Sequence, residues 1–479
     1  MTNRSSSHRS IARVTVEAAT PLFIGSGTSG LLIDALIQKD QNNLPYIPGS
    51  SLTGVLRHSL LATGQWGDGD AGSKLADVFG YQKGDDGQGS RLKVSSGLFM
   101  TSLEKVSEGI LEERDPELIK IMEDLPKRKH VRINERGVAS DKGLFDNQIL
   151  YQGARFVFEL EFTGSETEIK EIWEPILSRL KHPSFRIGQG TRKGYGRLSV
   201  ISVRERTFDL ENPDSLEAYI ALDPSFNKPL PASFTERTLD HVEASDNVIS
   251  YVLELMPEDF FIFSEGHGDD DADNRPVSEY VLRYAKGVNK SPERIPATLI
   301  PASSIKGALR HRVCYHHNLR LGRFADSENA RTAEHDEAVS FLFGNASGQE
   351  KENTSGSRGR VIMDDLLMEK GIDNNTVFNH VAINRFTGGA LRGFLFSEKV
   401  SRLDDHPSIK LDVTLDMSGI MDGISEQEKE GFRSDLEAAL KDICRGQLPL
   451  GGMTTKGHGI FTGRLFRNNL EIYEYDQGI

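Results

Sequence analysis

The chain has 479 residues, of which 37% are hydrophobic and 27% are charged, so its length allows about two to four folded domains and its composition excludes a wholly disordered chain. Its 57 basic and 71 acidic residues give a net charge of −14, which excludes a protein that coats DNA with a uniformly basic surface. The presence of only two cysteines argues against a disulfide framework. The polar N-terminus and the absence of a long apolar run predict a cytoplasmic protein without a signal peptide or membrane span.

The first predicted element is a strand at residues 13–17, where polar and apolar side chains alternate. The glycine-rich segment 25–30 follows it and formally matches a GxGxxG pattern. A dinucleotide site also needs a helix directly after the loop and an acidic residue about 20 positions on, and both are missing. The pattern therefore favours a flexible loop that presents Asp34, with a purely structural aspartate as the alternative.

Residues 47–58 read Ile-Pro-Gly-Ser-Ser-Leu-Thr-Gly-Val-Leu-Arg-His and predict a helix capped by the serine pair. The start of such a helix, with its backbone N–H groups and hydroxyls, favours an anion. We expect Gly54 to let another backbone approach closely, and Arg57 lies one turn beyond the serines. The alternative is an ordinary capped helix that packs on a sheet.

Two further blocks complete the first half of the chain. His-Val-Arg-Ile-Asn at 130–134 leads into a predicted β-hairpin whose exposed side chains could stack on bases. A strand at 155–161 and an amphipathic helix at 168–180 then precede the glycine-rich block 188–196, which presents basic side chains on an unobstructed backbone. The alternatives are a hairpin that completes the core and a plain tight turn.

The same blocks return in the same order after residues 208–248, which we interpret as an acidic linker. The twelve-residue helix block recurs at 300–311 with eight identities, where chance would give about one. The His-Val-x-Ile-Asn block recurs at 380–384 and the glycine-rich block at 451–459. One module is therefore duplicated, and its element order predicts an antiparallel α+β domain over 1–207 and another over 249–479.

The repeated blocks are strongly basic although the whole chain is acidic. Residues 47–58, 127–139, 185–197, 300–313, 375–396 and 445–464 hold 18 Lys or Arg and a single acidic residue, Glu135. An acidic exterior with basic seams suits a protein that holds RNA in a groove. The residues predicted to bind RNA are Ser50, Ser51, Arg57, His130, Arg132, Arg136, Arg192, Lys193, Ser303, Ser304, Lys306, Arg310, Arg385, Phe386, Thr455 and Lys456.

Metal-ligating residue types cluster at His311, Cys314, His316 and His317. No paired Cys-x-x-Cys and no second cluster completes a zinc site. We therefore interpret these side chains as core residues of a helix, and the sequence leaves any metal ligands unknown.

Together these blocks resemble the backbone RAMP subunits of type III CRISPR effector complexes, over about three-quarters of the chain. The most specific elements are Phe23-Ile-Gly-Ser-Gly27 with Asp34, the run 44–54, the motif 383–388 and the glycine-rich loops. The resemblance implies two RAMP subunits fused in tandem. Each would have a ferredoxin-like (RRM-like) fold, a β-hairpin thumb and a glycine-rich loop.

The resemblance also implies a function in the prokaryotic cytoplasm. The expected partners are a CRISPR guide RNA, a target single-stranded RNA, other RAMP subunits and a large polymerase-like subunit, with no membrane contact. The expected activity is that of an endoribonuclease that needs Mg²⁺ or another divalent metal and uses a ribose 2′-OH as nucleophile.

Asp34 occupies the position of the catalytic aspartate in this family. In the second copy Asp273 aligns with it, and Asp269, Asp270 and Asp271 are alternatives. Two other functions stay open: a scaffold subunit that binds RNA without cutting it, and a tandem ferredoxin-like protein that binds a small anion.

Overall fold

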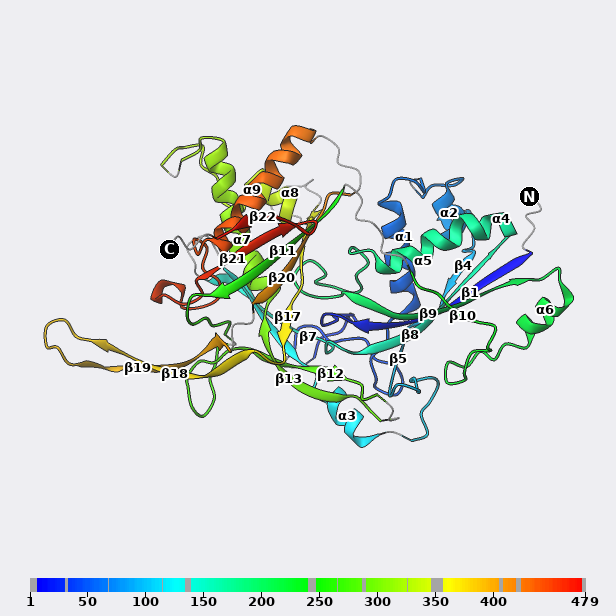
Figure 1. Cartoon of the computed structure of the whole chain (residues 1–479), viewed down its shortest axis with the longest axis horizontal. Coiled ribbons are helices and arrows are strands. Elements are labelled where there is room, and N and C mark those ends of the chain that lie inside the picture. Colours follow the sequence, from blue (N-terminus) through cyan, green and yellow to red (C-terminus); the bar gives the residue numbers. More distant parts are fainter. Residues whose placement is uncertain are drawn as a thin grey trace.

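The computed structural model describes residues 7–30, 33–67, 69–113, 115–133, 139–239, 247–264, 266–286, 290–324, 326–345, 356–404, 408–418 and 424–475. Figure 1 shows two halves side by side, each built on an antiparallel sheet against which helices pack. Each half has its own large hydrophobic core, one centred on residues such as Val14 and Phe156, the other on residues such as Leu253 and Leu436. The fold is therefore mixed α/β with antiparallel sheets, consistent with RRM-like folds.

The main sheet of the first half has the strand order β10-β9-β1-β8-β4, with β5 also paired to β8, and β10 is the short strand Thr235–Glu236. Its central strand follows from the alternation in the sequence: Ala12, Val14 and Val16 are buried in the core, and Arg13 and Thr15 lie on the opposite face. Its elements are β1 (His8–Ala18), α1 (Gly49–Leu61), α2 (Lys74–Phe79), β4 (Leu92–Val94), β5 (Leu98–Phe99), α3 (Pro116–Glu123), β6 (Lys127–Ile133), β7 (Ala139–Gln148), β8 (Arg155–Gly164), α4 (Glu166–Glu168), α5 (Glu174–Ser178) and β9 (Leu198–Asp209).

The main sheet of the second half has the order β16-β20-β11-β21-β22, and a small sheet β12-β13-β17 lies beside it. The hairpin β18–β19 projects far from the body of the molecule (Figure 1). The elements are β11 (Val248–Pro257), β12 (Ser278–Arg283), β13 (Glu293–Ile300), α7 (Ala302–Arg320), α8 (Glu337–Phe343), β16 (Val361–Met363), β17 (Leu366–Met368), β18 (Ile372–Ile383), β19 (Ala390–Leu403), β20 (Ile409–Asp416), α9 (Glu426–Cys444), β21 (Phe461–Arg467) and β22 (Leu470–Glu474).

The predicted strands 13–17 and 155–161 lie within β1 and β8, which confirms them. The helix predicted at 168–180 is also present, as α4 and α5 joined by a π-helical turn (Ile169–Trp173). It begins with a capping box in which Ser165 and Glu168 bond each other's backbone N–H groups. Ser425 and Glu428 start α9 in the same way, so local capping sets these two helix starts.

The serine pairs do not cap α1 and α7, so that prediction was wrong. The N-cap residues are Pro48 and Pro301, neither of which makes a side-chain cap bond. Proline lacks an N–H but its carbonyl accepts the first helical bonds, so the serines fall within the first turn. The close backbone approach expected at Gly54 is also absent, because a Cβ atom there would meet no described atom within 4 Å.

The segment predicted as an acidic linker has structure of its own where it is described. β9 runs on to Asp209, α6 (Pro213–Ile220) follows, and β10 (Thr235–Glu236) pairs with β9. Phe208 and Phe234 form a small core beside the first sheet. Residues 208–239 therefore pack against the first half.

The two halves meet through buried ion pairs. Arg128 of β6 donates to Asp365 Oδ2 at 2.8 Å and to Glu279 Oε2 at 2.9 Å, and at most 7% of each of these three side chains is exposed. Burial opposes the charge of Arg128, but the carboxylates of Asp365 and Glu279 raise its pKa well above the usual value. Asp364 accepts from Arg186 at 2.5 Å and from Arg197 at 2.9 Å. These contacts hold the glycine-rich loop of the first half against the second half.

Candidate functional site

A cavity of about 400 Å³ lies between the glycine-rich loop of the first half and the start of α7 in the second half. The two sequence blocks therefore meet across the contact between the halves and not within one copy. None of the described lining residues is acidic. The lining consists of Gly190, Thr191, Arg192, Lys193, Ser303, Lys306, Gly307, Arg310 and Phe343.

Lys306 forms the positive centre of this junction cavity. Its Nζ donates to the carbonyl oxygens of Arg192 and Val361, at 2.8 and 2.7 Å. Burial, together with the charges of Lys193 and Arg186, lowers the pKa of Lys306 to about 7. An anion in the cavity would stabilise the charged form of this lysine, so the cavity favours a phosphate.

Two other predicted residues of the cavity also use part of their donor capacity within the chain. Arg192 Nε donates to the Gly359 carbonyl at 3.0 Å, and Arg310 donates to the Ala333 carbonyl at 2.8 Å. The first N–H of α7, that of Ala302, donates to Asp365 at 2.8 Å. Because Asp365 already accepts this N–H, the binding of an anion at the start of α7 would depend mainly on side-chain donors.

The glycine at position 307 opens the wall of the cavity. A Cβ atom there would meet no described atom within 4 Å, so no packing within the described chain requires glycine. Glycine inside a helix costs roughly 0.5–1 kcal/mol relative to alanine. Gly307 therefore leaves this side of α7 open to the cavity.

The hairpins and the glycine-rich loops converge in the same way in both halves. The ring of His130 stacks on Phe145 with centroids 5.0 Å apart, and Lys193 lies 5.0 Å from the Phe145 centroid. In the second half His380 stacks on Phe396 at 4.7 Å, and Lys456 lies 4.4 Å from that centroid. This matched arrangement brings two of the repeated blocks, the His-Val-x-Ile-Asn hairpin and the glycine-rich loop, into contact in each half.

His130 is part of this packing. Its Nε2 lies 3.0 Å from the Tyr195 hydroxyl, and the residue is 9% exposed. Burial, with Lys193 and Arg128 nearby, lowers its pKa to about 4, so the ring is neutral near pH 7. In this structure His130 supports the base of the hairpin.

The aspartates predicted to be catalytic take equivalent positions in the two halves. Asp34 and Asp146 exchange bonds: each carboxylate accepts the backbone N–H of the other, at 2.9 and 2.8 Å. Asp273 accepts from the backbone N–H and hydroxyl of Ser397, at 2.7 and 3.0 Å. In each half the residue after the aspartate forms a parallel bridge with the hairpin: Ala35 with Asn147, and Asn274 with Glu398. The two aspartates therefore lie in the same register against their hairpins. Both aspartates are exposed beside a hairpin strand.

The alternative aspartates of the second half have a different environment. Lys399 Nζ lies 2.8 Å from Asp269 and 2.8 Å from Asp271. The hydrogen bond from Lys399 lowers the pKa of Asp269, and backbone N–H groups add to the effect. The geometry therefore matches Asp273, and not these two residues, to Asp34.

The remaining predicted residues lie outside the lining of the junction cavity. Ser50, Ser304, Arg385, Thr455 and Lys456 are exposed, and Phe386 at the hairpin tip is 98% exposed. Ser51 and Arg57 are half-buried. Arg136 and the side chain of Arg132 lie outside the described residues.

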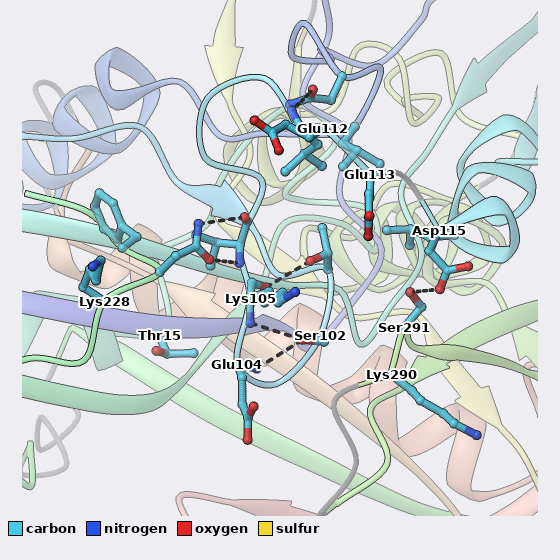
Figure 2. Close-up of a pocket in the computed structure, with 18 of the residues that line it drawn as sticks. Thr15, Ser102, Glu104, Lys105, Glu112, Glu113, Asp115, Lys228, Lys290 and Ser291 are labelled. Atoms are coloured by element: carbon cyan, nitrogen blue, oxygen red, sulfur yellow. Dashed lines mark hydrogen bonds between the residues drawn. The ribbon is translucent and has the colours of Figure 1, made fainter.

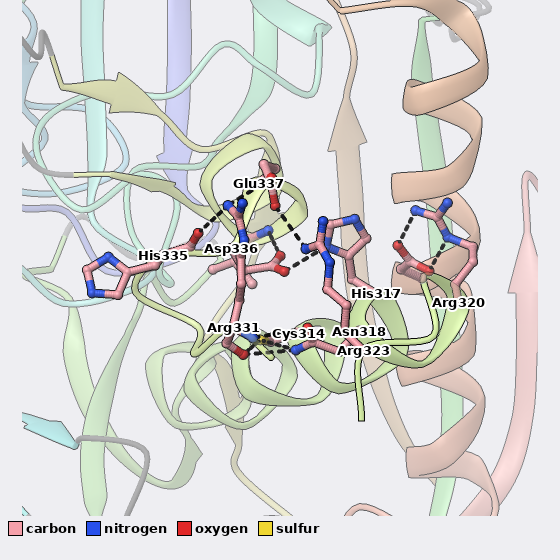
Figure 3. Close-up of polar contacts among 11 residues, drawn as sticks. Cys314, His317, Asn318, Arg320, Arg323, Arg331, His335, Asp336 and Glu337 are labelled. Carbon is pink, nitrogen blue, oxygen red and sulfur yellow. Dashed lines mark hydrogen bonds and ion pairs between the residues drawn. The ribbon is translucent and has the colours of Figure 1, made fainter. Parts of the chain in front are cut away.

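Figure 3 shows the polar contacts of Cys314 and His317 of α7 with the residues around them. His317 Nδ1 lies 2.6 Å from Asp336, and Cys314 Sγ donates to the Arg331 carbonyl at 3.2 Å. Ligand atoms of His317, Asp336 and Glu337 are close enough for a metal, but Arg331 already pairs with Glu337 at 2.8 Å. Burial and the nearby Asp336 charge raise the pKa of the Cys314 thiol to about 11, so it stays protonated. Cys314 and His317 are buried in the core as predicted, whereas His311 and His316 are half-buried.

A larger cavity of about 1180 Å³ is lined mostly by the first half, with Lys290 and Ser291 of the second half at its edge, and holds none of the predicted residues. Figure 2 shows that Lys105, Lys228 and Lys290 lie around it together with acidic residues such as Glu104 and Glu112. This mixture of charges contrasts with the basic lining of the junction cavity.

Comparison with known proteins identifies the class. A family model described as the RAMP superfamily matches residues 15–199 and 298–462. The chain therefore belongs to the RAMP superfamily and carries two RAMP domains. No curated protein matches the sequence. Within the described residues, no helix has both the length and the apolar character needed to cross a membrane.

The signals missed in the sequence lie at the contact between the halves. Arg128 belongs to a block predicted to bind RNA, but its charge pairs with Asp365 and Glu279. Asp364 and Asp365 received no role. Alignment of the two copies around these residues would have found them, because the first copy has Ser95 and Ser96 at the corresponding positions.

Proposed function

We propose that the chain is a backbone subunit of a type III CRISPR ribonucleoprotein complex, in which it binds the guide RNA and cleaves complementary target RNA. RAMP membership indicates a CRISPR-associated subunit with RNA and protein partners. The observation that carries the proposal is the junction cavity, where the glycine-rich loop of one domain and the helix block of the next line one basic hollow. A phosphate of the guide backbone fits this lining.

The strand orders support a ferredoxin-like palm in each domain. In the order β9-β1-β8-β4, the first strand lies between the last and third strands of the unit, and β21-β11-β20-β16 repeats this arrangement. The hairpins β6–β7 and β18–β19 are the proposed thumbs. Phe386 at the tip of the second hairpin presents an aromatic face suited to stacking on a base.

Asp34 and Asp273 are the proposed catalytic residues. In the cleavage step the aspartate accepts the proton of a ribose 2′-OH, the O2′–P bond forms and the P–O5′ bond breaks. The leaving 5′-oxygen takes a proton from water, so the products are a 2′,3′-cyclic phosphate and a 5′-hydroxyl. Positioned proton transfer of this kind contributes roughly 10²–10⁴-fold to a rate. The hydrogen bonds from Asp146 and Ser397 fix the two carboxylates beside the thumbs.

The donor set at Asp34 fits the divalent metal implied by the family. Mg²⁺ is commonly held by one or two carboxylates and several waters. Asp34 and Asp146 lie close enough to supply two carboxylates, and Asp273 and Ser397 supply a carboxylate and a hydroxyl. When bound there, the metal would stabilise negative charge that develops on the phosphate.

The protonation of Lys306 tests the RNA-binding role of the cavity. Because its pKa is about 7 in the folded chain, single-stranded RNA should bind roughly tenfold more weakly at pH 8.5 than at pH 7. Lys306→Met should weaken binding and abolish this pH dependence, as measured by fluorescence anisotropy at constant ionic strength. Lys170→Met, which removes an exposed lysine on another surface, is the control.

The free energy of unfolding of the RNA-free chain should rise with pH, whereas its affinity for RNA should fall. Between about pH 7 and pH 10.5 the unfolded chain binds more protons at this lysine than the folded chain, so stability should rise with pH.

If Lys306→Met binds RNA as wild type does at both pH values, the cavity is not an RNA site.

A further inference from the structure

Around Arg128, the contact between the two halves joins a basic face to an acidic face. A separate, more exposed ion pair has the opposite polarity, with Arg294 of the second half 2.7 Å from Asp124 of the first. The first half contributes the basic face, formed by Arg128, Arg186 and Arg197. The second half contributes the acidic face, formed by Glu279, Asp364 and Asp365. A head-to-tail contact of this kind could in principle continue from one chain to the next, because each half is a copy of the same module.

The acidic face has an uncharged counterpart on the first half. Ile300 pairs with Leu366 in the second half as Ile47 pairs with Gly97 in the first. The first helical N–H then bonds Asp365 in α7 and Ser96 in α1. By this register Ser95 and Ser96 stand where the second half has Asp364 and Asp365.

The basic face likewise has an uncharged counterpart on the second half. His130 pairs with Phe145 as His380 pairs with Phe396, so Phe378 corresponds to Arg128. The N–H groups of Gln189 and Gly452 bond the carbonyls of Phe23 and Ile262, which aligns the glycine-rich loops. By that alignment Pro449 and Ile460 correspond to Arg186 and Arg197.

We propose that these charges form a joint that occurs once in the chain, fixes the order of the two domains and prevents a second copy from adding head to tail. Within the described residues, the basic face of the first half pairs with the acidic face of the second half. Contact between two chains would instead bring Phe378, Pro449 and Ile460 against Ser95 and Ser96, without the ion pairs that select the internal contact. The neighbour at either end is therefore a different polypeptide. This inference concerns assembly and does not depend on the proposed cleavage activity.

The test transfers the charges to the outer faces of the full chain. One variant carries Phe378→Arg and Ile460→Arg, and a second carries Ser95→Asp and Ser96→Asp. Wild type and each variant alone should sediment as monomers, whereas an equimolar mixture of the two variants should form a species of twice the mass at low salt. Because surface charge pairs are screened, this species should dissociate at high salt.

Two results would overturn the proposal. One is a mixture of folded variants that stays monomeric, and the other is wild-type chain that self-associates with cross-links between its two outer faces. Circular dichroism checks that each variant is folded. If Phe378→Arg disturbs the hairpin, Pro449→Arg with Ile460→Arg replaces that variant in the same mixture.

Discussion

Replacement of Asp34 by asparagine is expected to slow cleavage at one position of the target RNA by roughly 10²–10⁴-fold. Asparagine keeps an oxygen that can accept the Asp146 N–H, so the loop stays in place while the proton acceptor is lost. Binding of the target should be unchanged, because no predicted backbone contact is altered. The measurement is a gel assay of end-labelled target with the assembled complex and Mg²⁺.

The second domain provides the matched comparison. Asp273→Asn should remove a different product, and the double variant should lose both, because the two aspartates occupy equivalent places. Asp270→Asn, an exposed aspartate in the same loop as Asp273, is the control and should cut normally. An unchanged product pattern in the double variant, with cleavage by wild type abolished by EDTA, would assign cutting to another subunit and make this chain a scaffold.

The second large effect is expected at Arg128. Its replacement by methionine leaves the carboxylates of Asp365 and Glu279 buried without their cation. Loss of one partner from a buried ion pair costs roughly 3–5 kcal/mol, so the urea concentration at half-unfolding should fall markedly. The measurement is urea unfolding followed by circular dichroism and by tryptophan fluorescence.

Arg197→Met is the control for this experiment. Its side chain is 48% exposed, and an ion pair at such a site contributes about 0–1 kcal/mol. Adding Glu279→Gln and Asp365→Asn to Arg128→Met should restore much of the stability, because no buried charge is then left unpaired. Equal effects of Arg128→Met and Arg197→Met would contradict the buried joint.

Local patterns account for the parts of the fold that the sequence predicted. The alternation of polar and apolar side chains predicted strands β1 and β8. The repeated blocks predicted two domains with the same order of elements. The prediction of serine caps was wrong because a proline two positions before each serine pair supplies the carbonyl that starts the helix. Capping preference is a local rule, and here the backbone of a neighbouring residue overrides it.

Contacts between distant segments account for what the sequence did not predict. Alignment within each copy placed Lys193 and Lys306 in separate motifs, and only the packing of one domain on the next brings them into one cavity. The burial of His130 was likewise invisible, since its partners Phe145 and Tyr195 come from later elements. The spacing from the preceding strand aligns Asp273 with Asp34 in the sequence. The bridges beside each hairpin place the same two residues in equivalent positions.

The most direct test of the account is the identity of the RNA bound by the native complex. The complex is purified from its natural host through a tag on this chain, and its bound RNA is extracted and sequenced. We expect guide RNAs transcribed from a CRISPR array, because the junction cavity is lined by groups that bind a phosphate backbone. The account would be contradicted by a complex that contains its partner subunits but no RNA, or that carries only a small phosphorylated molecule.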